Sequence, residues 1–307
     1  MPQIDRILHP TDFSESAEVA LRNAVHLARH FEAEIHLLHV LQVLHSYVEG
    51  PLPSAYAGSG SLPDFYSEFQ REAEEQLSQM VEQHSAPDVR IKPILSPAAS
   101  AAPLILEYAT EEHADLIVMG THGRRAVERL LLGSVAEEVV HSSRCNVYVV
   151  RATEDDPAPR SIQRILVPVD FSEASAMAVA RAKEWADSHG AQLDVLHVIE
   201  PLPFTVSLAS SVSIYDLDPD IIENTHRELQ TFIDGADGPD VPASLHVEEG
   251  SVGRTIVEKS EEADVDMIVI ASQGRSAIRR FVLGSVTERV LRTARRPVLT
   301  VRSEDGT

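Results

Sequence analysis

Residues 120–123, read as Gly-Thr-His-Gly, and the Gly-Ser pair at 133–134 decide how this chain is expected to fold. The arrangement returns as Ala-Ser-Gln-Gly at 271–274, followed by a second Gly-Ser pair at 284–285. Nine residues separate the tetrapeptide from the Gly-Ser pair in both copies, and an apolar run precedes each tetrapeptide. A short apolar run that ends at a glycine is typical of a parallel strand buried on both faces. The pattern therefore predicts a strand, a loop and the start of a helix at each of the two places.

The glycines and the helix start together suggest a binding site for an anion. Gly120 and Gly123 permit turn conformations and a close backbone approach that a side chain would obstruct. A helix predicted over residues 135–141 would present its free N–H groups and its positive dipole end to the loop. A phosphate group suits such a position. Gly-x-x-Gly is a common pattern, and two tight connections without a ligand remain the alternative, which the repeat makes less favoured.

Composition narrows the class of protein. With 307 residues the chain is long enough for two domains. Its formal net charge of −22 argues against a general nucleic-acid binder, because phosphate backbones are held by clustered cations. No apolar stretch approaches the roughly 20 residues of a membrane span, and residues 1–6 lack the pattern of a signal peptide. We expect a cytoplasmic protein without membrane contact, whose single cysteine, Cys145, is a packed and inert thiol.

The second half of the chain repeats the first. Residues 162–172 match residues 4–14 at an offset of 158, and the loop motifs match at an offset of 151. The sequence predicts one domain over 1–152, an acidic, proline-containing linker over 153–159 and a second domain over 160–304.

Strand and helix patterns alternate within each half, which predicts two doubly wound α/β domains, each with a five-stranded parallel sheet. The side chains expected in the core from the helix over 64–84 are Phe65, Phe69, Leu77 and Met80. The first-half strands are predicted over 4–10, 34–41, 88–95, 116–119 and 146–151, and a further helix over 99–113.

The role of two loop-like segments and of several histidines is open at this point. The segment 47–63 is rich in Pro, Gly and Ser, as its second-half counterpart 201–219 is in Pro and Ser, and the first is either a flap over a site or a surface excursion. Several histidines invite a metal site, but no paired ligand spacing is present. His39 and His197 occupy equivalent strand positions, where a structural role is favoured.

Both halves resemble universal stress protein domains, and the chain is identified as a tandem member of that family. The resemblance is carried by residues 7–14, Ile-Leu-His-Pro-Thr-Asp-Phe-Ser, by the Gly-x-x-Gly-x9-Gly-Ser spacing over 120–134, and by their second-half counterparts. It implies a flavodoxin-like or Rossmann-like sheet in the order 3-2-1-4-5, and it implies that ATP or a related adenine nucleotide, ADP or AMP, is bound. Mg²⁺ would accompany the triphosphate. Family members pair through strand five, which implies an internal pseudo-dimer through 147–150 and 298–301 and allows a homodimer of whole chains.

The resemblance also implies a role for particular residues. Asp12 and Asp170 would line the adenosine pocket, Val40 and Val198 would meet the adenine through their backbone, and the Gly and Ser residues would hold ribose and phosphates. Ala271 departs from the pattern, since a glycine belongs there, and its methyl either crowds the ligand or is accommodated. The expected first site is Pro10, Thr11, Asp12, Val40, Gly120, His122, Gly123, Arg124, Gly133, Ser134 and Val135. The expected second site is Pro168, Val169, Asp170, Val198, Ala271, Gly274, Arg275, Gly284, Ser285 and Val286.

The sequence favours a binding protein over an enzyme. It lacks the Gly-x-Ser-x-Gly elbow of serine hydrolases, the phosphate loop with its lysine, a kinase signature and the dinucleotide fingerprint after the first strand of either half. The leading hypothesis is a stress-response sensor that binds an adenine nucleotide and an unknown protein partner. The alternatives are a slow ATPase or autophosphorylating enzyme, using Ser134 or a motif histidine, and a scaffold with empty sites.

Overall fold

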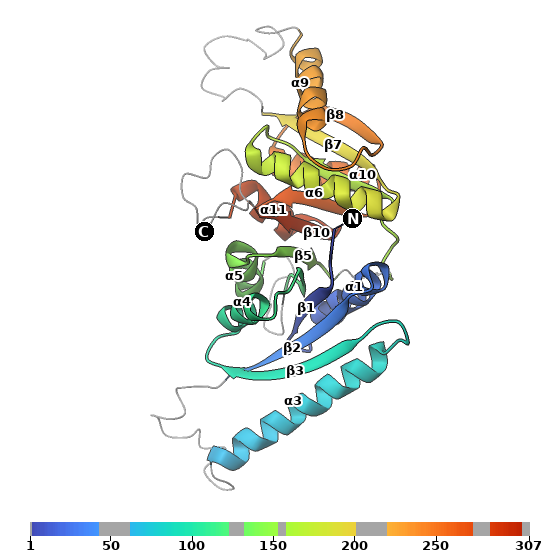
Figure 1. Cartoon of the computed structure of the whole chain (residues 1–307). Coiled ribbons are helices and arrows are strands. Elements are labelled where there is room, and N and C mark those ends of the chain that lie inside the picture. The colour runs from blue at the N-terminus through green and yellow to red at the C-terminus, as the bar shows by residue number, and fades with distance from the viewer. Residues whose placement is uncertain are drawn as a thin grey trace, which may run out of the picture.

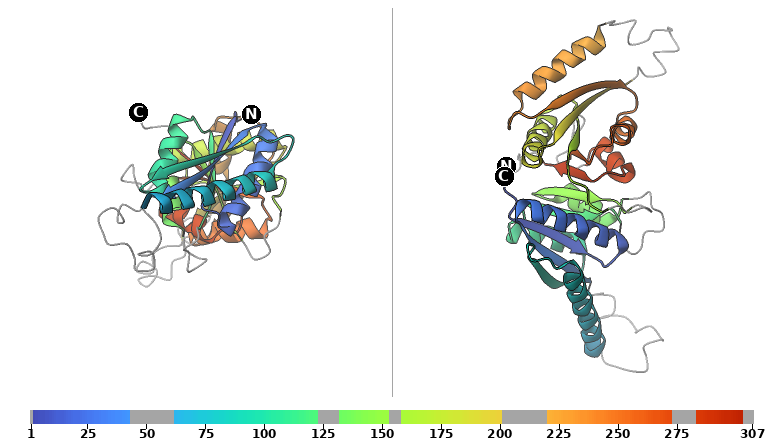
Figure 2. Two further views of the ribbon diagram at one scale, coloured as in Figure 1. Left: turned by 90° about the horizontal axis from the view of Figure 1, so that it is seen from below. Right: turned by 90° about the vertical axis from the view of Figure 1, so that its right-hand side faces the viewer.

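Ten strands of the described part of the chain form one continuous sheet (Figure 1). The computed structural model describes residues 2–42, 62–122, 132–152, 158–200, 220–272 and 283–302, with the side chains of 62–65 excepted. The strand order is β3-β2-β1-β4-β5-β10-β9-β6-β7-β8, so each half has the expected order 3-2-1-4-5 and the two halves meet at their fifth strands. The predicted fold class is confirmed. In Figure 2 the halves lie end to end, with α3 and α9 at opposite ends of the molecule.

Each half alternates strands and helices along the chain, and within each half all described strand pairs are parallel. The first half contains β1 (Arg6–Thr11), α1 (Glu15–Phe31), β2 (Glu34–Gln42), α3 (Leu62–His84), β3 (Ile91–Ala98), α4 (Ala101–Glu111), β4 (Leu116–Gly120), α5 (Ser134–Ser142) and β5 (Asn146–Val150). The second half contains β6 (Arg164–Pro168), α6 (Glu173–His189), β7 (Gln192–Ile199), α9 (Ile221–Gly235), β8 (Ala243–Glu249), α10 (Val252–Glu262), β9 (Met267–Ala271), α11 (Ser285–Thr293) and β10 (Val298–Val301).

Helices cover both faces of the sheet, and the alternation of side chains along each strand feeds two separate cores. Ile7 belongs to the core under one layer of helices, and its neighbour Leu8 belongs to the core under the other. Side chains from α1, α3, α6 and α9 fill the first core: Leu21, Leu77, Trp185 and Leu229. Side chains from α4, α5, α10 and α11 fill the second: Ile105, Val139, Ile256 and Leu291. Among the described helices, none is long and apolar enough to cross a membrane.

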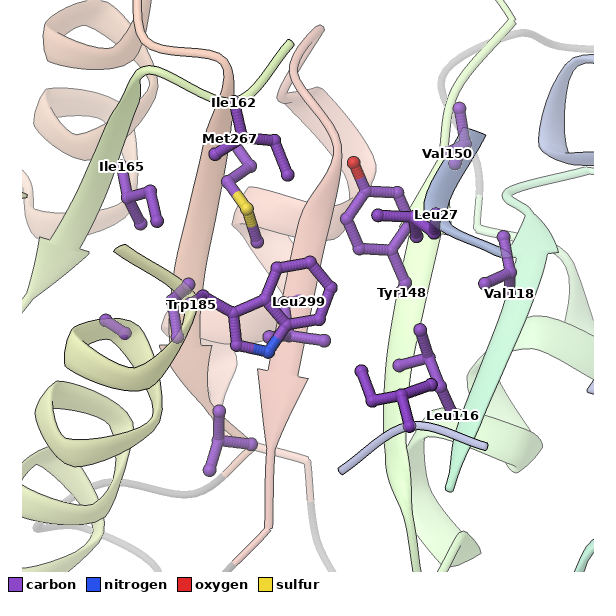
Figure 3. Close-up of a cluster of buried hydrophobic side chains, with 14 of the residues drawn as sticks. Leu27, Leu116, Val118, Tyr148, Val150, Ile162, Ile165, Trp185, Met267 and Leu299 are labelled. Atoms are coloured by element: carbon purple, nitrogen blue, oxygen red, sulfur yellow. The ribbon is translucent and has the colours of Figure 1, made fainter. Parts of the chain in front are cut away.

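The halves are joined by an antiparallel pair, β5 with β10, which continues the sheet across the junction. The register pairs Val149 with Val298 and Tyr148 with Leu299, so the predicted contact between residues 147–150 and 298–301 is present. On one face of this seam the rings of Tyr148 and Trp185 stack nearly parallel, with centroids 6.1 Å apart (Figure 3). Trp185 is 1% exposed. The junction is therefore part of the hydrophobic core, which makes the two halves one packed unit.

Two arginines strengthen the same junction reciprocally. Arg151, just after β5, donates to the carbonyls of Leu291, Arg292 and Ala294 at the end of α11. Arg302, just after β10, donates to the carbonyl of Ser143 at the end of α5. The last carbonyls of a helix have no intrahelical partner, and a cation there also matches the negative end of the helix dipole. Each half thus caps the final helix of the other.

Two expectations from the sequence are wrong at the outer edge of the first half. The third strand runs from Ile91 to Ala98 rather than over 88–95, because Val89 is taken into a short bridge with Ala86. Its later part contains Pro97, which an edge strand tolerates since one side of its ladder is open. Phe69 is 47% exposed and not in the core, whereas Leu77 and Met80 are buried as predicted. Phe65 and nearly all of the segments 47–63 and 201–219 lie outside the described residues and side chains.

Candidate functional site

The expected site residues of each half gather at one edge of the sheet. β1 lies between β2 and β4, and the connections on its two sides pass over opposite faces. The carboxyl ends of β1 and β4 therefore form a topological switch point, the place where open α/β sheets bind ligands. Thr11 ends β1, and Gly120 ends β4 beside it. In the second half Pro168 and Ala271 end the corresponding strands, β6 and β9.

The loop after β1 is fixed by its own polar side chains. Asp12 Oδ1 accepts from the N–H of Ser14 at 3.1 Å, and Thr11 Oγ1 accepts from the N–H of Phe13 at 3.1 Å. Ser14 caps α1 by accepting from the N–H of Ala17 at 3.2 Å. Phe13 has a φ of +62°, which is rare for a residue with a bulky side chain. The turn holds Asp12 in a defined position at the edge of the sheet.

A histidine from β2 supports this turn. His39 Nδ1 donates to the carbonyl of Thr11 at 2.8 Å, and its ring packs on Phe13 with centroids 4.3 Å apart. His197 repeats the contact, donating to the carbonyl of Val169 at 2.8 Å and packing on Phe171. The structural role predicted for both histidines is confirmed.

The second half builds the same turn with more hydroxyls. Asp170 Oδ1 accepts from the N–H of Ser172 at 3.1 Å and from the hydroxyls of Ser172 and Ser175, each at 2.5 Å. Phe171 again has a φ of +62°. The strained conformation persists in both halves because the aspartate, the capping serine and the histidine all hold it. Ser175 also supports the turn through Asp170. It was not among the residues predicted from the sequence, and no spacing rule would have found it.

The loop after β4 is closed at its base by backbone hydrogen bonds. The N–H of Thr121 donates to the carbonyl of Val150 at 3.0 Å, and the N–H of Gly133 donates to the carbonyl of Thr121 at 2.8 Å. A Cβ on Gly133 would lie 3.2 Å from that carbonyl oxygen, which is a tight contact. In the second half Ser272 donates to Val301, and Gly284 donates to the carbonyl of Ser272 at 3.1 Å. Both Gly-Ser pairs are thus drawn against the end of the preceding strand.

The helices that follow begin without a side-chain cap. Gly133 and Gly284 are the N-cap residues of α5 and α11, and neither can cap the N–H groups of the first turn. Ser134 and Ser285 are the first helical residues. At both places the helix N-terminus, with its positive dipole end, is aligned with the edge where Asp12 and its counterpart lie.

Gly120 is required by helix α1 rather than by the loop. A Cβ on Gly120 would lie 2.4 Å from Ser16 Oγ, 2.8 Å from the Ser16 carbonyl oxygen and 2.9 Å from its carbonyl carbon. Alanine stands at the matching position 271, and the residue matching Ser16 is Ala174. Ala271 is 8% exposed and belongs to the core beneath α6, with Ala174 packed against that core. The extra methyl is therefore directed at the core under α6, and the smaller residue on that helix accommodates it.

The remaining expected residues lie near the same edge. Val40 and Val198 are buried near the ends of β2 and β7. Val40 follows His39, which is the last residue of β2 that pairs with β1. Val135 and Val286 pack against the core under α5 and α11. Pro10 is half-buried in β1. Gly123, Arg124, Gly274 and Arg275 lie outside the described residues.

His122 is less readily protonated than an ordinary histidine. Burial, and secondarily the charge of Arg151, lowers the pKa of His122 from its ordinary value. Its Nδ1 lies 2.7 Å from the hydroxyl of Thr121, and its buried Nε2 has no hydrogen-bond partner among the described residues. Within the described part of the chain no three His, Cys, Asp or Glu residues are grouped so that they could hold a metal ion. The described groups that could position a ligand are backbone N–H groups, helix ends and an aspartate.

Comparison with known proteins gives consistent matches over both halves. A model of the universal stress protein family matches residues 3–151 and again residues 161–302. A universal stress protein of Mycobacterium bovis is 31% identical over 212 residues, an alignment that spans 66% of either chain. A universal stress protein of Mycobacterium tuberculosis is 28% identical over 305 residues, covering 95% of this chain and 94% of the relative. The crystal structure of a universal stress protein from Archaeoglobus fulgidus superposes with a TM-score of 0.69 at 24% identity, covering 98% of this chain and 99% of that chain.

Proposed function

The chain belongs to the universal stress protein family, and from that premise we propose that each half binds one adenine nucleotide, ATP or a related one. The nucleotide would lie across the carboxyl ends of β1 and β4 in the first half and of β6 and β9 in the second. The bound state would be sensed by a protein partner, so that the chain acts as a ligand-gated stress sensor in the cytoplasm.

One observation supports the proposal most strongly. In both halves a glycine draws the start of a helix against the end of the preceding strand, and no side chain caps that helix. The uncapped N–H groups of α5 and α11 then suit the phosphates, because an anion at a helix N-terminus gains both hydrogen bonds and the favourable dipole. In a chain of net charge −22, such local features are what an anionic ligand needs.

The adenosine end of the ligand would meet the turn after β1. Asp12 and Asp170 are held there by hydrogen bonds within their own turns, which suits a carboxylate that accepts from ribose or base without reorganising. Any Mg²⁺ would accompany the triphosphate and be held mainly by phosphate oxygens.

The second site is proposed on the same footing as the first. Ala271 stands where the first half has Gly120, and its methyl either crowds the ligand or is accommodated away from it. At the equivalent position in the first half, a Cβ on Gly120 would face Ser16 of α1. Ala271 belongs to the core under α6, and Ala174, which matches Ser16, packs against the same core. The alanine then leaves the ligand side of the loop as open as a glycine would.

Substitutions at the helix starts test this arrangement. Ser134→Glu and Ser285→Glu each add a negative charge where a phosphate would bind, and an acidic residue in the first turn favours the helix itself. We expect each variant to lose one of two nucleotide sites, and the double variant to lose both, without loss of stability. Ser78→Glu, on the exposed face of α3, adds the same charge away from both sites and should bind two nucleotides. Equal binding by the double variant and by Ser78→Glu would contradict the proposal.

A binding protein and a slow enzyme are separated by single-turnover incubation with labelled ATP. The described residues of the site include no lysine and no group of acidic metal ligands, the parts that drive ordinary phosphoryl transfer, and binding alone does not accelerate chemistry. We expect the label to be recovered as intact ATP over minutes. Quantitative release of phosphate, or label attached to the protein, would establish the ATPase or autophosphorylating alternative. A scaffold with empty sites would bind no nucleotide in either experiment.

A further inference from the structure

A polar cavity lies at the junction of the two halves. Its volume is about 300 Å³, at the lower end of the range for ligand pockets. The first half contributes Ile4, Asp115 and Arg144, and the second half contributes Arg181, Trp185 and Arg302. None of its lining residues belongs to either candidate nucleotide site. The cavity exists only because β5 and β10 bring the halves together.

Three guanidinium groups line this cavity in a chain that is otherwise strongly acidic. Arg144 is exposed and forms no ion pair with a described residue, whereas Arg302 donates to the carbonyl of Ser143. Arg181 pairs through Nη1 with Glu184 at 2.5 Å, but its buried Nε has no hydrogen-bond partner among the described residues. A carboxylate among the lining residues, Asp115, already accepts from the N–H groups of Asp5 and Arg6 through one oxygen. Positive charge and donor capacity therefore exceed what the described neighbours use.

The internal repeat provides a comparison within the same molecule. The residue that matches Arg144 is Arg295, which pairs with Glu261 at 3.6 Å. Next to it, Arg296 pairs with Asp264 at 2.5 Å. On the cavity side the residues that match these two carboxylates are Thr110 and His113.

The residue that matches Arg181 also differs. It is Asn23, whose side-chain amide donates to the carbonyl of Val19 within α1. One side of the junction thus pairs both of its arginines with carboxylates. On the cavity side Cys145 replaces one arginine and neither carboxylate is kept, so Arg144 has no ion pair with a described residue.

We propose that this cavity binds the phosphate group of a small molecule, either free phosphate or a phosphate monoester. Guanidinium groups match phosphate geometry with paired hydrogen bonds, and several of them favour a doubly charged anion over a single carboxylate. Because both halves line the cavity, its occupation would stabilise their junction.

Trp185, the only tryptophan in the chain, lines the cavity and serves as the reporter. Inorganic phosphate is titrated into the tag-free chain at constant ionic strength, and the fluorescence of Trp185 is followed. The double variant Ser134→Glu with Ser285→Glu serves as the background, so that phosphate bound at the helix starts does not contribute. We expect a saturable change in that background.

The Arg144→Gln variant should weaken phosphate binding by about tenfold or more, because it removes a charge-assisted hydrogen bond. Arg295→Gln is the matched control, since it removes the equivalent but paired arginine, and it should leave the affinity unchanged. Circular dichroism checks that both variants remain folded. No saturable change, the same change with sodium chloride alone, or equal affinities for the two variants would overturn the proposal.

Discussion

Replacing Gly120 by alanine is the most informative single change in the candidate site, because the second half already carries that alanine at Ala271. The backbone of Gly120 is not in the left-handed region, so a side chain meets no backbone strain there. The obstacle is contact: the new Cβ would lie 2.4 Å from Ser16 Oγ and 2.8 Å and 2.9 Å from two backbone atoms of the same residue. All three distances are shorter than real Cβ contacts, and two of the atoms cannot move unless α1 shifts.

The magnitude follows from these contacts. Overpacking of this kind costs about 1–3 kcal/mol, and the backbone contacts place Gly120→Ala near the upper end. Ser16→Ala alone should be neutral or stabilising by about 1 kcal/mol, since the Ser16 hydroxyl is buried without a hydrogen-bond partner among the described residues. The double variant reproduces the second-half pair, Ala174 with Ala271. It should recover about 1 kcal/mol of the loss, which is a typical coupling for two residues in contact.

The assay is urea unfolding of the parent chain, the two single variants and the double variant, with near-ultraviolet circular dichroism as the signal. The reverse change, Ala271→Gly, should cost only about 0.5–1 kcal/mol, from backbone entropy. A Gly120→Ala variant as stable as the parent chain, or a double variant that loses the sum of the two single changes, would refute the argument that the helix, and not the ligand, demands the glycine.

Further predictions concern the junction and the core. Arg151→Met should lower the free energy of unfolding by about 2–3 kcal/mol, because three helix-end carbonyls lose their donor. Arg302→Met should lower it by about 1–2 kcal/mol, because one carbonyl loses its donor. Urea unfolding should show the larger loss for Arg151→Met, and the reverse order would argue against the reciprocal caps. Burial lowers the pKa of His9 to about 4 in the folded chain, whereas the unfolded chain has the ordinary value of about 6.5. Because the folded pKa is the lower one, the stabilisation is complete above the unfolded pKa and is lost as the pH falls toward 4. Between pH 7 and pH 5 the loss should be about 1–2 kcal/mol. His9→Val should flatten the pH dependence of stability by that amount, and an unchanged slope would show that His9 does not titrate as described.

Much of the fold could be predicted because the second half of the chain repeats the sequence pattern of the first. The repeated motif located the strand, loop and helix start, and the resemblance supplied the strand order and the pairing of the fifth strands, which the sheet confirms. The edges were less predictable. Phe69 has helical spacing suited to a core position, yet it is exposed on a helix that packs mainly against the outer strands β2 and β3.

The supports of the candidate site depend on tertiary contacts that no local pattern encodes. The aspartate turn and the capping serine could be inferred from neighbours in sequence. The hydrogen bond from His39 to Thr11 and the contact of Gly120 with Ser16 join residues 28 and 104 positions apart. The offset of 158 between the halves does offer one signal, since it aligns Ser16 with Ala174 as the partners of a glycine and an alanine.

The central claim is that two backbone cradles, one in each half, bind an adenine nucleotide. Titration calorimetry of ATP into the full chain, first freed of any retained nucleotide by denaturation and refolding, tests it most directly. The account predicts saturable heat with two nucleotides bound per chain. A stoichiometry of one would contradict the second site, and the absence of binding in a correctly refolded chain would contradict the account as a whole.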